Sequence, residues 1–358
     1  MSRLVFEPIT LRGMTARNRL WVPPMCQYSV EAQDGVATDW HMVHLGGLAR
    51  GGAGAVIVEA TAVTPEGRIS PQDLGLWNDE QRDALAPIVG FMQSQGTKAG
   101  IQLAHAGRKA STYRTFEPER SGSVPVSDGG WQTVAPSALA YPELAEPQAL
   151  DQAGIKQLIA AFQAAARRAV DAGFDFIEVH GAHGYLLHEF LSPLSNTRDD
   201  DYGGSLENRA RFLLQVVDVI REEVPDDMPL FVRLSAVDWI DTGLTIDDTV
   251  QVVRWLDEHG VDLIDVSSGS NLPAKIPSGP GYQVKFAETI RERTGVPTAA
   301  VGLITQPFQA EHILTTGQAD VVLVGRESLR NANFPIHAAQ VLRHKTPPTP
   351  IQYHRAYR

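Results

Sequence analysis

The sequence contains almost no cysteine, since Cys26 is the single example among 358 residues. No disulfide can form within the chain, so a fold held by a disulfide framework is excluded. An iron–sulfur cluster, which needs several thiolate ligands, is excluded for the same reason. Residues 1–10 hold no apolar run preceded by basic side chains, the mark of a secretory signal. We therefore expect a protein of a reducing compartment, the cytoplasm.

Basic residues are in the minority, because 31 Lys and Arg stand against 42 Asp and Glu, for a formal net charge of −11. Such a chain has no basic field to neutralise the phosphates of a nucleic acid, so we expect no nucleic-acid partner. Local arginines and backbone N–H groups can still hold the phosphate of a small cofactor. No apolar stretch is long enough to span a bilayer, so we expect no membrane partner.

Eight short apolar runs are present, and each is nearly continuous, as in strands of a parallel sheet covered by helices. They occupy residues 20–25, 55–60, 99–105, 176–180, 230–235, 263–267, 298–302 and 321–325. Segments of helical periodicity separate them, for example residues 158–170 and 212–220. Eight such alternations predict an α/β fold, a (β/α)₈ TIM barrel, as one domain over residues 1–358. An open doubly wound sheet is the alternative, but it usually has fewer strands.

Two segments interrupt this alternation. Residues 108–150 are rich in Pro, Gly and Ser and follow the third apolar run. An irregular insertion of that length often covers a functional site. The tail, residues 346–358, carries three prolines and then Tyr353, Arg355, Tyr357 and Arg358. It is either a frayed terminus or an arm that reaches a neighbouring subunit.

The active site of a TIM barrel lies at the carboxyl ends of its strands, so the residues after each run are the functional candidates. The first run leads into Pro-Pro-Met-Cys-Gln-Tyr at residues 23–28, in which the prolines fix a sharp turn. Cys26 is either a small buried apolar residue, the commoner fate of a lone cysteine, or part of the site. Tyr28 is a candidate for capping the pocket with its hydroxyl.

The fourth run is followed by two histidines and a tyrosine, His180, His183 and Tyr185. Two histidines flanked by glycines are harder to explain as core residues than one is. They suit a metal, although no third ligand is evident nearby. They also suit two hydrogen bonds to one oxygen, as in an oxyanion hole, with Tyr185 as general acid. That second arrangement would activate an alkene conjugated to a carbonyl.

Two polar residues interrupt apolar runs and need partners. Gln102 requires donors and acceptors in a buried setting, and the edge of a heteroaromatic ring would supply both. Arg233 is costly in a strand interior unless it is paired. It either forms a buried ion pair with a carboxylate or lies beside a cofactor ring that becomes anionic on reduction, and we favour the second interpretation.

The seventh and eighth runs end at Gly302 and at Gly325-Arg326. In these barrels the loops after strands seven and eight form the usual phosphate site. Glycine allows close approach of the backbone, and Arg326 supplies a forked donor for phosphate oxygens. The sequence therefore predicts a phosphate-binding end of the site here.

Together these features resemble the old yellow enzyme family of flavin mononucleotide (FMN)-dependent ene-reductases, over essentially the whole chain. The most specific segments are residues 23–28, His-Gly-Ala-His-Gly-Tyr at 180–185, and Asp-Tyr-Gly-Gly-Ser-Leu-Glu-Asn-Arg-Ala-Arg-Phe at 201–212. In the last, Ser205 is a candidate helix N-cap. The presence of both Cys26 and Tyr28 is similar to the bacterial subclass called thermophilic-like, in which that cysteine lies near the flavin.

The resemblance implies a role for particular residues. The flavin ring and ribityl chain are expected to contact Pro23, Pro24, Met25, Cys26, Ala60, Gln102 and Arg233, and the phosphate end Gly302, Gly325 and Arg326. His180 and His183 are expected to bind the substrate oxygen, Tyr185 to donate a proton and Tyr28 to close the pocket. Arg355 resembles an arm residue that some members insert into a partner's active site, which implies a homodimer or homotetramer.

The reaction implied by the resemblance is a ping-pong cycle. NADPH or NADH reduces FMN, and hydride then passes to the β-carbon of an α,β-unsaturated carbonyl while Tyr185 protonates the α-carbon. Nitroalkenes, maleimides and nitrate esters are further candidate substrates. Two alternatives remain open at this point: a metal-dependent TIM-barrel lyase or hydrolase that uses His180 and His183, and a flavin-binding protein without catalysis.

Overall fold

The computed structural model of the chain describes residues 3–117 and 119–357. Its main sheet has eight parallel strands in the order β3-β12-β11-β10-β9-β8-β5-β4. A parallel bridge between Val22 and Val56 joins the two outer strands, with backbone hydrogen bonds of 2.9 and 3.0 Å on either side of Val22. The sheet is thus closed into a TIM barrel, as the sequence predicts.

The strands of the barrel are β3 (Leu20–Trp21), β4 (Ala55–Ala62), β5 (Lys98–Ala104), β8 (Phe176–Gly181), β9 (Leu230–Ser235), β10 (Leu263–Ser267), β11 (Thr298–Ala300) and β12 (Val321–Leu323). Three of them are shorter than their apolar runs. The first strand stops before Pro23, because proline has no N–H to donate to a neighbouring strand. The seventh stops before Gly302, whose φ of +133° leaves the extended conformation.

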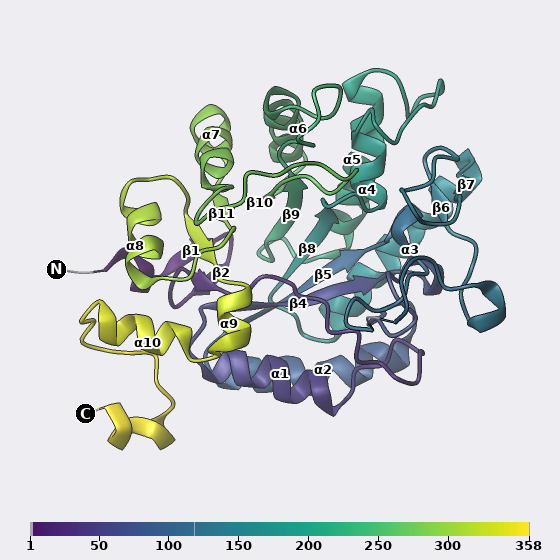
Figure 1. Cartoon of the computed structure of the whole chain (residues 1–358). Coiled ribbons are helices and arrows are strands. Elements are labelled where there is room, and N and C mark those ends of the chain that lie inside the picture. The colour runs from purple at the N-terminus through teal and green to yellow at the C-terminus, as the bar shows by residue number, and fades with distance from the viewer. Residues whose placement is uncertain (1–2, 118, 358) are drawn as a thin grey trace.

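Helices surround the strands (Figure 1). They are α1 (Asp39–Arg50), α2 (Asp79–Ser94), α3 (Gln152–Asp171), α4 (Leu186–Leu191), α5 (Leu206–Glu223), α6 (Ile246–Glu258), α7 (Val284–Thr294), α8 (Pro307–Thr315), α9 (Arg326–Arg330) and α10 (Phe334–Val341). The Ser205 side chain caps α5 by accepting from the N–H of Asn208 at 3.2 Å, as its place in the sequence predicts. Gly173 and Gly295 follow α3 and α7 with φ of +87° and +80°, a conformation typical of glycine after a helix.

The amino-terminal end of the barrel is closed. A hairpin of β1 (Ile9–Leu11) and β2 (Met14–Ala16) contributes to an apolar cluster with residues of the barrel interior. Within this cluster the rings of Phe176 and Phe231 lie 4.7 Å apart, and Trp21 lies 6.0 Å from each. Because this end is filled with aromatic side chains, a site in the barrel interior would open toward the carboxyl end.

The insertion after β5 folds against that carboxyl end. It contains η3 (Gly107–Lys109), η4 (Val126–Asp128) and a small sheet of β6 (Val134–Ala135) and β7 (Gln148–Ala149). Arg68, which follows η2 (Pro65–Gly67), lies 4.8 Å over the Trp131 ring and 5.4 Å over the Trp77 ring. This contact joins the insertion to the loop after β4, so both loops border the same end of the barrel.

The two termini lie outside the barrel. The chain starts with η1 (Leu4–Phe6), and its tail forms η5 (Ile351–Tyr357) beyond α10 (Figure 1). In the tail the Tyr353 hydroxyl accepts from Arg50 Nη1 on α1 at 2.5 Å. Among the helices of the described residues, none has the length and apolar run needed to cross a membrane.

Candidate functional site

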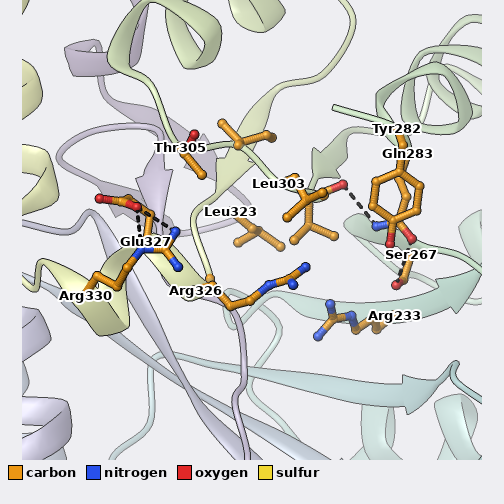
Figure 2. Close-up of a pocket in the computed structure, with 14 residues that line it drawn as sticks. Arg233, Ser267, Tyr282, Gln283, Leu303, Thr305, Leu323, Arg326, Glu327 and Arg330 are labelled. Atoms are coloured by element: carbon orange, nitrogen blue, oxygen red, sulfur yellow. Dashed lines mark hydrogen bonds and ion pairs between the residues drawn. The ribbon is translucent and has the colours of Figure 1, made fainter. Parts of the chain in front are cut away.

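A cavity of about 230 Å³ opens at the carboxyl ends of β9 to β12. Figure 2 shows the Arg326 side chain extending across it toward Arg233. Within residues 3–117 and 119–357, the Arg326 guanidinium has no hydrogen bond or ion pair, whereas Arg330 is held by Glu327 at 2.8 Å. The guanidinium groups of Arg233 and Arg326 are both directed into this cavity, which suits an anionic ligand although the chain as a whole is acidic.

The two glycines of the predicted phosphate end border this cavity. A Cβ placed on Gly302 would lie 3.1 Å from the Tyr282 ring, and its φ of +133° is strained for any other residue. A Cβ on Gly325 would lie 3.5 Å from Pro23 and 3.7 Å from Met25, so the end of β12 adjoins the loop after β3. The structure thus brings together two segments that are 300 residues apart and that the sequence assigns to one cofactor.

Four buried polar side chains occupy the barrel interior beneath this cavity: Gln102, Glu178, Arg233 and Asp265. Gln102 Nε2 donates to Glu178 Oε1 at 2.7 Å, so its amide already has a protein partner, in addition to any cofactor edge. Arg233 Nε lies 3.0 Å from Asp265 Oδ2, so the ion pair that the sequence left as the less favoured alternative is present. The two interpretations of Arg233 are compatible, because the same side chain also lines the cavity.

His180 and His183 lie side by side, with ring centroids 5.2 Å apart. The Nδ1 atom of His180 accepts from the N–H of Ala182 at 3.3 Å, which leaves Nε2 to carry the proton. His183 has a left-handed φ of +61°, and its Nε2 lies 2.6 Å from Ser267 Oγ. Burial, and then the positive charge of Arg233, lower the pKa of both rings well below the usual value, so both are neutral near pH 7.

Tyr185 lies 5.0 Å from His180, ring to ring, at the start of α4. Cys26, Tyr28 and Tyr185 pack against one apolar cluster that includes Ala60. Burial raises the pKa of all three groups above their usual values, and the charge of Asp73 acts in the same direction. Both tyrosines therefore keep their protons at neutral pH.

The sequence interpretation missed Lys109, which follows Arg108 at the end of β5. Its Nζ donates to the carbonyl oxygens of His183 at 2.8 Å and Ser270 at 3.2 Å, and lies 5.0 Å over the Tyr185 ring. Burial lowers its pKa to about 8. The signal was available, because Lys109 lies at the start of the insertion that follows the third apolar run.

Two expectations from the sequence concern the Arg355 tail and a metal site. Arg355 lies on the exposed tail, which contacts α1 of its own chain through Tyr353. Its approach to a neighbour's site stays a prediction.

As for a metal, the described residues contain no group of three or more His, Cys, Asp or Glu placed to hold one. The orientation of His183 toward Ser267 favours hydrogen bonding over ligation.

The chain matches a family of known proteins over nearly its full length. Residues 4–345 match the NADH:flavin oxidoreductase / NADH oxidase family. A protein named NADPH dehydrogenase from Geobacillus thermodenitrificans is 49% identical, with 100% of each chain covered. Another NADPH dehydrogenase, from Bacillus subtilis, is 48% identical, again with 100% of each chain covered.

Solved structures give the same result. The chain is similar to an old yellow enzyme homologue from Zymomonas mobilis, with a TM-score of 0.77 and 26% identity. The likeness covers 97% of this chain and 95% of that one.

Proposed function

Since the chain belongs to the NADH:flavin oxidoreductase / NADH oxidase family, whose cofactors are FMN and NADPH or NADH, we propose that it is an ene-reductase. The observation that carries the proposal is the convergence of His180, His183 and Tyr185 beside the cavity that Arg233 and Arg326 line. FMN supplies two-electron chemistry when bound, by taking up hydride from the nicotinamide and giving it to the β-carbon of an activated alkene.

The cofactor-binding assignment follows the cavity. We assign the ring and ribityl contacts to Pro23, Pro24, Met25, Cys26, Ala60, Gln102 and Arg233, and the phosphate contacts to Gly302, Gly325 and Arg326. The cavity fits FMN because it is lined by Arg326, whose guanidinium has no partner among the described residues, by two glycines and by further polar side chains such as Arg233. Arg326 would hold the phosphate by charge-assisted hydrogen bonds.

The substrate oxygen is proposed to bind between the two histidines. The Nε2–H of His180 is a free donor, because Nδ1 is already occupied by the Ala182 N–H. His183 can turn its Nε2–H from Ser267 to the same oxygen. Two neutral donors polarise a carbonyl without becoming a proton source, which raises the electrophilicity of the β-carbon. Nitroalkenes, maleimides and nitrate esters present comparable oxygens.

Tyr185 is proposed to protonate the α-carbon from its hydroxyl. Its raised pKa keeps the proton in place until charge develops on the substrate, as a general acid requires. Tyr28, which packs with Cys26 against the same apolar cluster, would close the pocket. Both half-reactions would use the same space, so the oxidised nicotinamide must leave before the alkene binds, which gives ping-pong kinetics.

We further propose that residues 1–358 act as one FMN-binding domain, in the cytoplasm, as a homodimer or homotetramer. The single cysteine supports the reducing compartment. The exposed Arg355, on the tail that lies beyond α10 in Figure 1, supports an arm that completes a neighbour's site. The insertion at residues 108–150 would form one wall of the substrate pocket.

The decisive experiment follows the visible spectrum of the purified protein anaerobically, with NADPH and then 2-cyclohexenone added. A flavin spectrum that bleaches with NADPH and returns with the enone supports both half-reactions. Flavin that is reduced only slowly and is not reoxidised by any alkene would make this a flavin-binding protein without ene-reductase activity. Protein that takes up no FMN on reconstitution would refute the proposal, and inhibition by chelators would then favour a metal enzyme.

A further inference from the structure

The barrel interior holds two carboxyl groups around one guanidinium. Glu178 and Asp265 are fully buried, and Gln102 and Arg233 are 1% and 8% exposed. The strand register pairs Gln102 with Glu178, and Arg233 with Asp265. Registered residues on neighbouring parallel strands point to the same face, so all four side chains share the inner face of β5, β8, β9 and β10.

These groups are not balanced in charge if both carboxyls are ionised. Two carboxylates and one guanidinium would leave a net charge of −1 in an interior from which water is excluded, which is costly. Retention of one proton removes the excess. Each carboxyl group has an oxygen that could carry this proton, because Glu178 Oε2 and Asp265 Oδ1 are buried and form no hydrogen bond within residues 3–117 and 119–357.

The contacts distinguish the two acids. Asp265 lies 3.0 Å from the Arg233 guanidinium, whose charge favours the ionised form. Among the described residues, Glu178 has only the neutral amide of Gln102 as a hydrogen-bond partner. The pKa values follow this difference: burial raises the pKa of Asp265 to about 6, still below neutral, and raises the pKa of Glu178 well above its usual range.

We propose that Asp265 is a positioning residue that partly cancels the charge which Arg233 presents to the flavin, while Glu178 stays protonated and neutral. The inference rests on the proposed function, because it places the FMN ring beside Arg233. A reduced flavin carries negative charge, and a bare guanidinium would stabilise it strongly. Asp265 weakens that stabilisation, so the reduced cofactor remains a good hydride donor to the alkene.

Matched isosteric variants test this assignment on the FMN-loaded protein. The midpoint potential of the bound flavin is measured anaerobically by equilibration with a reference dye. Asp265→Asn should favour the reduced form at least tenfold, a positive shift of about 30 mV for a two-electron couple. Glu178→Gln should change the potential by less than that, because one neutral group replaces another. Asp218→Asn is the control. Asp218 is a half-exposed residue that contacts His259, and loss of its negative charge should leave the potential unchanged.

Infrared spectroscopy gives a second measurement that needs no Asp265 variant. The wild-type protein at pH 7 should show the carbonyl bands of its buried protonated carboxyls, Glu189 among them, and one of these bands should be absent from Glu178→Gln. A spectrum that loses no such band on this substitution overturns the assignment of the proton. A stable Asp265→Asn protein with unchanged potential overturns the role of Asp265 but leaves the ene-reductase intact. Failure of the wild-type protein to bind FMN overturns both this inference and the proposed function.

Discussion

At the scale of single residues, burial fixes the protonation states on which the proposed chemistry depends. His180, which is buried, and His183, which is partly buried, are neutral because they are desolvated near Arg233, and Tyr185 keeps its proton because it is desolvated against an apolar cluster. In water each of these side chains would have a pKa near its usual value, so the histidines would be partly protonated at neutral pH. The same side chains on an open surface would therefore not form this site.

Tyr185→Phe separates the two half-reactions. Loss of the hydroxyl removes the proposed proton donor but leaves the packing, so reoxidation by an enone should slow by about 10²- to 10⁴-fold. Reduction by NADPH should change little. Stopped-flow measurement of each half-reaction checks this, with Tyr141→Phe in the insertion as a control for ring packing near Lys109. Equal slowing of both steps would show that Tyr185 is not the acid.

Arg326→Ala tests the phosphate end of the cavity. A hydrogen bond to a charged group contributes about 1.5–3 kcal/mol, so FMN should bind about ten- to hundred-fold more weakly. Equilibrium titration of the apoprotein, followed by flavin fluorescence, measures the change. Arg330→Ala is the matched control, because the Arg330 side chain is already held by Glu327. Similar losses for both variants would indicate a general effect of charge instead of a specific contact.

At the scale of elements, the loop between β8 and α4 shows how the fold orients the site. The N–H of Gly184 donates to His188 Nδ1 at 2.8 Å, and His188 Nε2 lies 3.1 Å from Asp238 Oδ1. Burial alone raises the pKa of Asp238, but His188 and two hydrogen bonds bring it below its usual value. This chain of contacts ties the loop that carries His183 and Tyr185 to the loop after β9.

His188→Phe breaks this chain and removes the imidazole nitrogen that lies 3.1 Å from the buried Asp238 carboxylate. Leaving a buried carboxylate without one of its polar partners typically lowers the free energy of unfolding by about 1–3 kcal/mol. Urea denaturation monitored by circular dichroism measures the loss. His259→Phe, at the half-exposed pair with Asp218, should cost about 1 kcal/mol or less. A His188→Phe protein as stable as the wild type would contradict this account of the loop.

The elements themselves were largely predictable from sequence. Apolar runs located all eight strands, and Ser205 marked the start of α5. Those signals are local, since caps and periodicity act within a few residues. The partners of Gln102 and Arg233 were not predictable, because Glu178 and Asp265 belong to other strands and meet them only in the closed barrel.

At the scale of the whole molecule, buried acids predict the dependence of stability on pH. Burial raises the pKa of Asp73 to about 7 and that of Glu189 to about 8, whereas in the unfolded chain both ionise near pH 4. Between these limits the folded state binds more protons than the unfolded state. Stability contributed by these groups is therefore complete at about pH 4 and falls as pH rises to about 8.

Thermal denaturation between pH 6 and pH 9 checks this dependence. The Tm of the wild type should fall across the range, and Asp73→Asn should give a shallower fall. Asp128→Asn, at a solvent-exposed position in the insertion, is the control and should follow the wild-type curve. If Asp73→Asn and the wild type lose the same number of degrees, the carboxyl of Asp73 does not ionise in this range.

Arg355 tests the proposed assembly. If the tail enters a neighbour's site, Arg355→Ala should raise the KM for an enone about tenfold, with little change in flavin reduction. The mass in solution, measured by light scattering, should be that of at least a dimer for both proteins. Arg343→Ala, on the surface before the tail, is the control. A monomeric wild type would exclude the arm.

The sequence by itself determined the class of fold, the family and the positions of the chemistry-bearing residues along the chain. These follow from apolar periodicity and short motifs, in which each residue acts through its immediate neighbours. Tertiary structure decided which of those residues meet, and in which state of charge. Closure of the barrel pairs Arg233 with Asp265, brings Lys109 over Tyr185 and withdraws His180 from water. Such contacts depend on burial and on distance across strands, which no local pattern encodes.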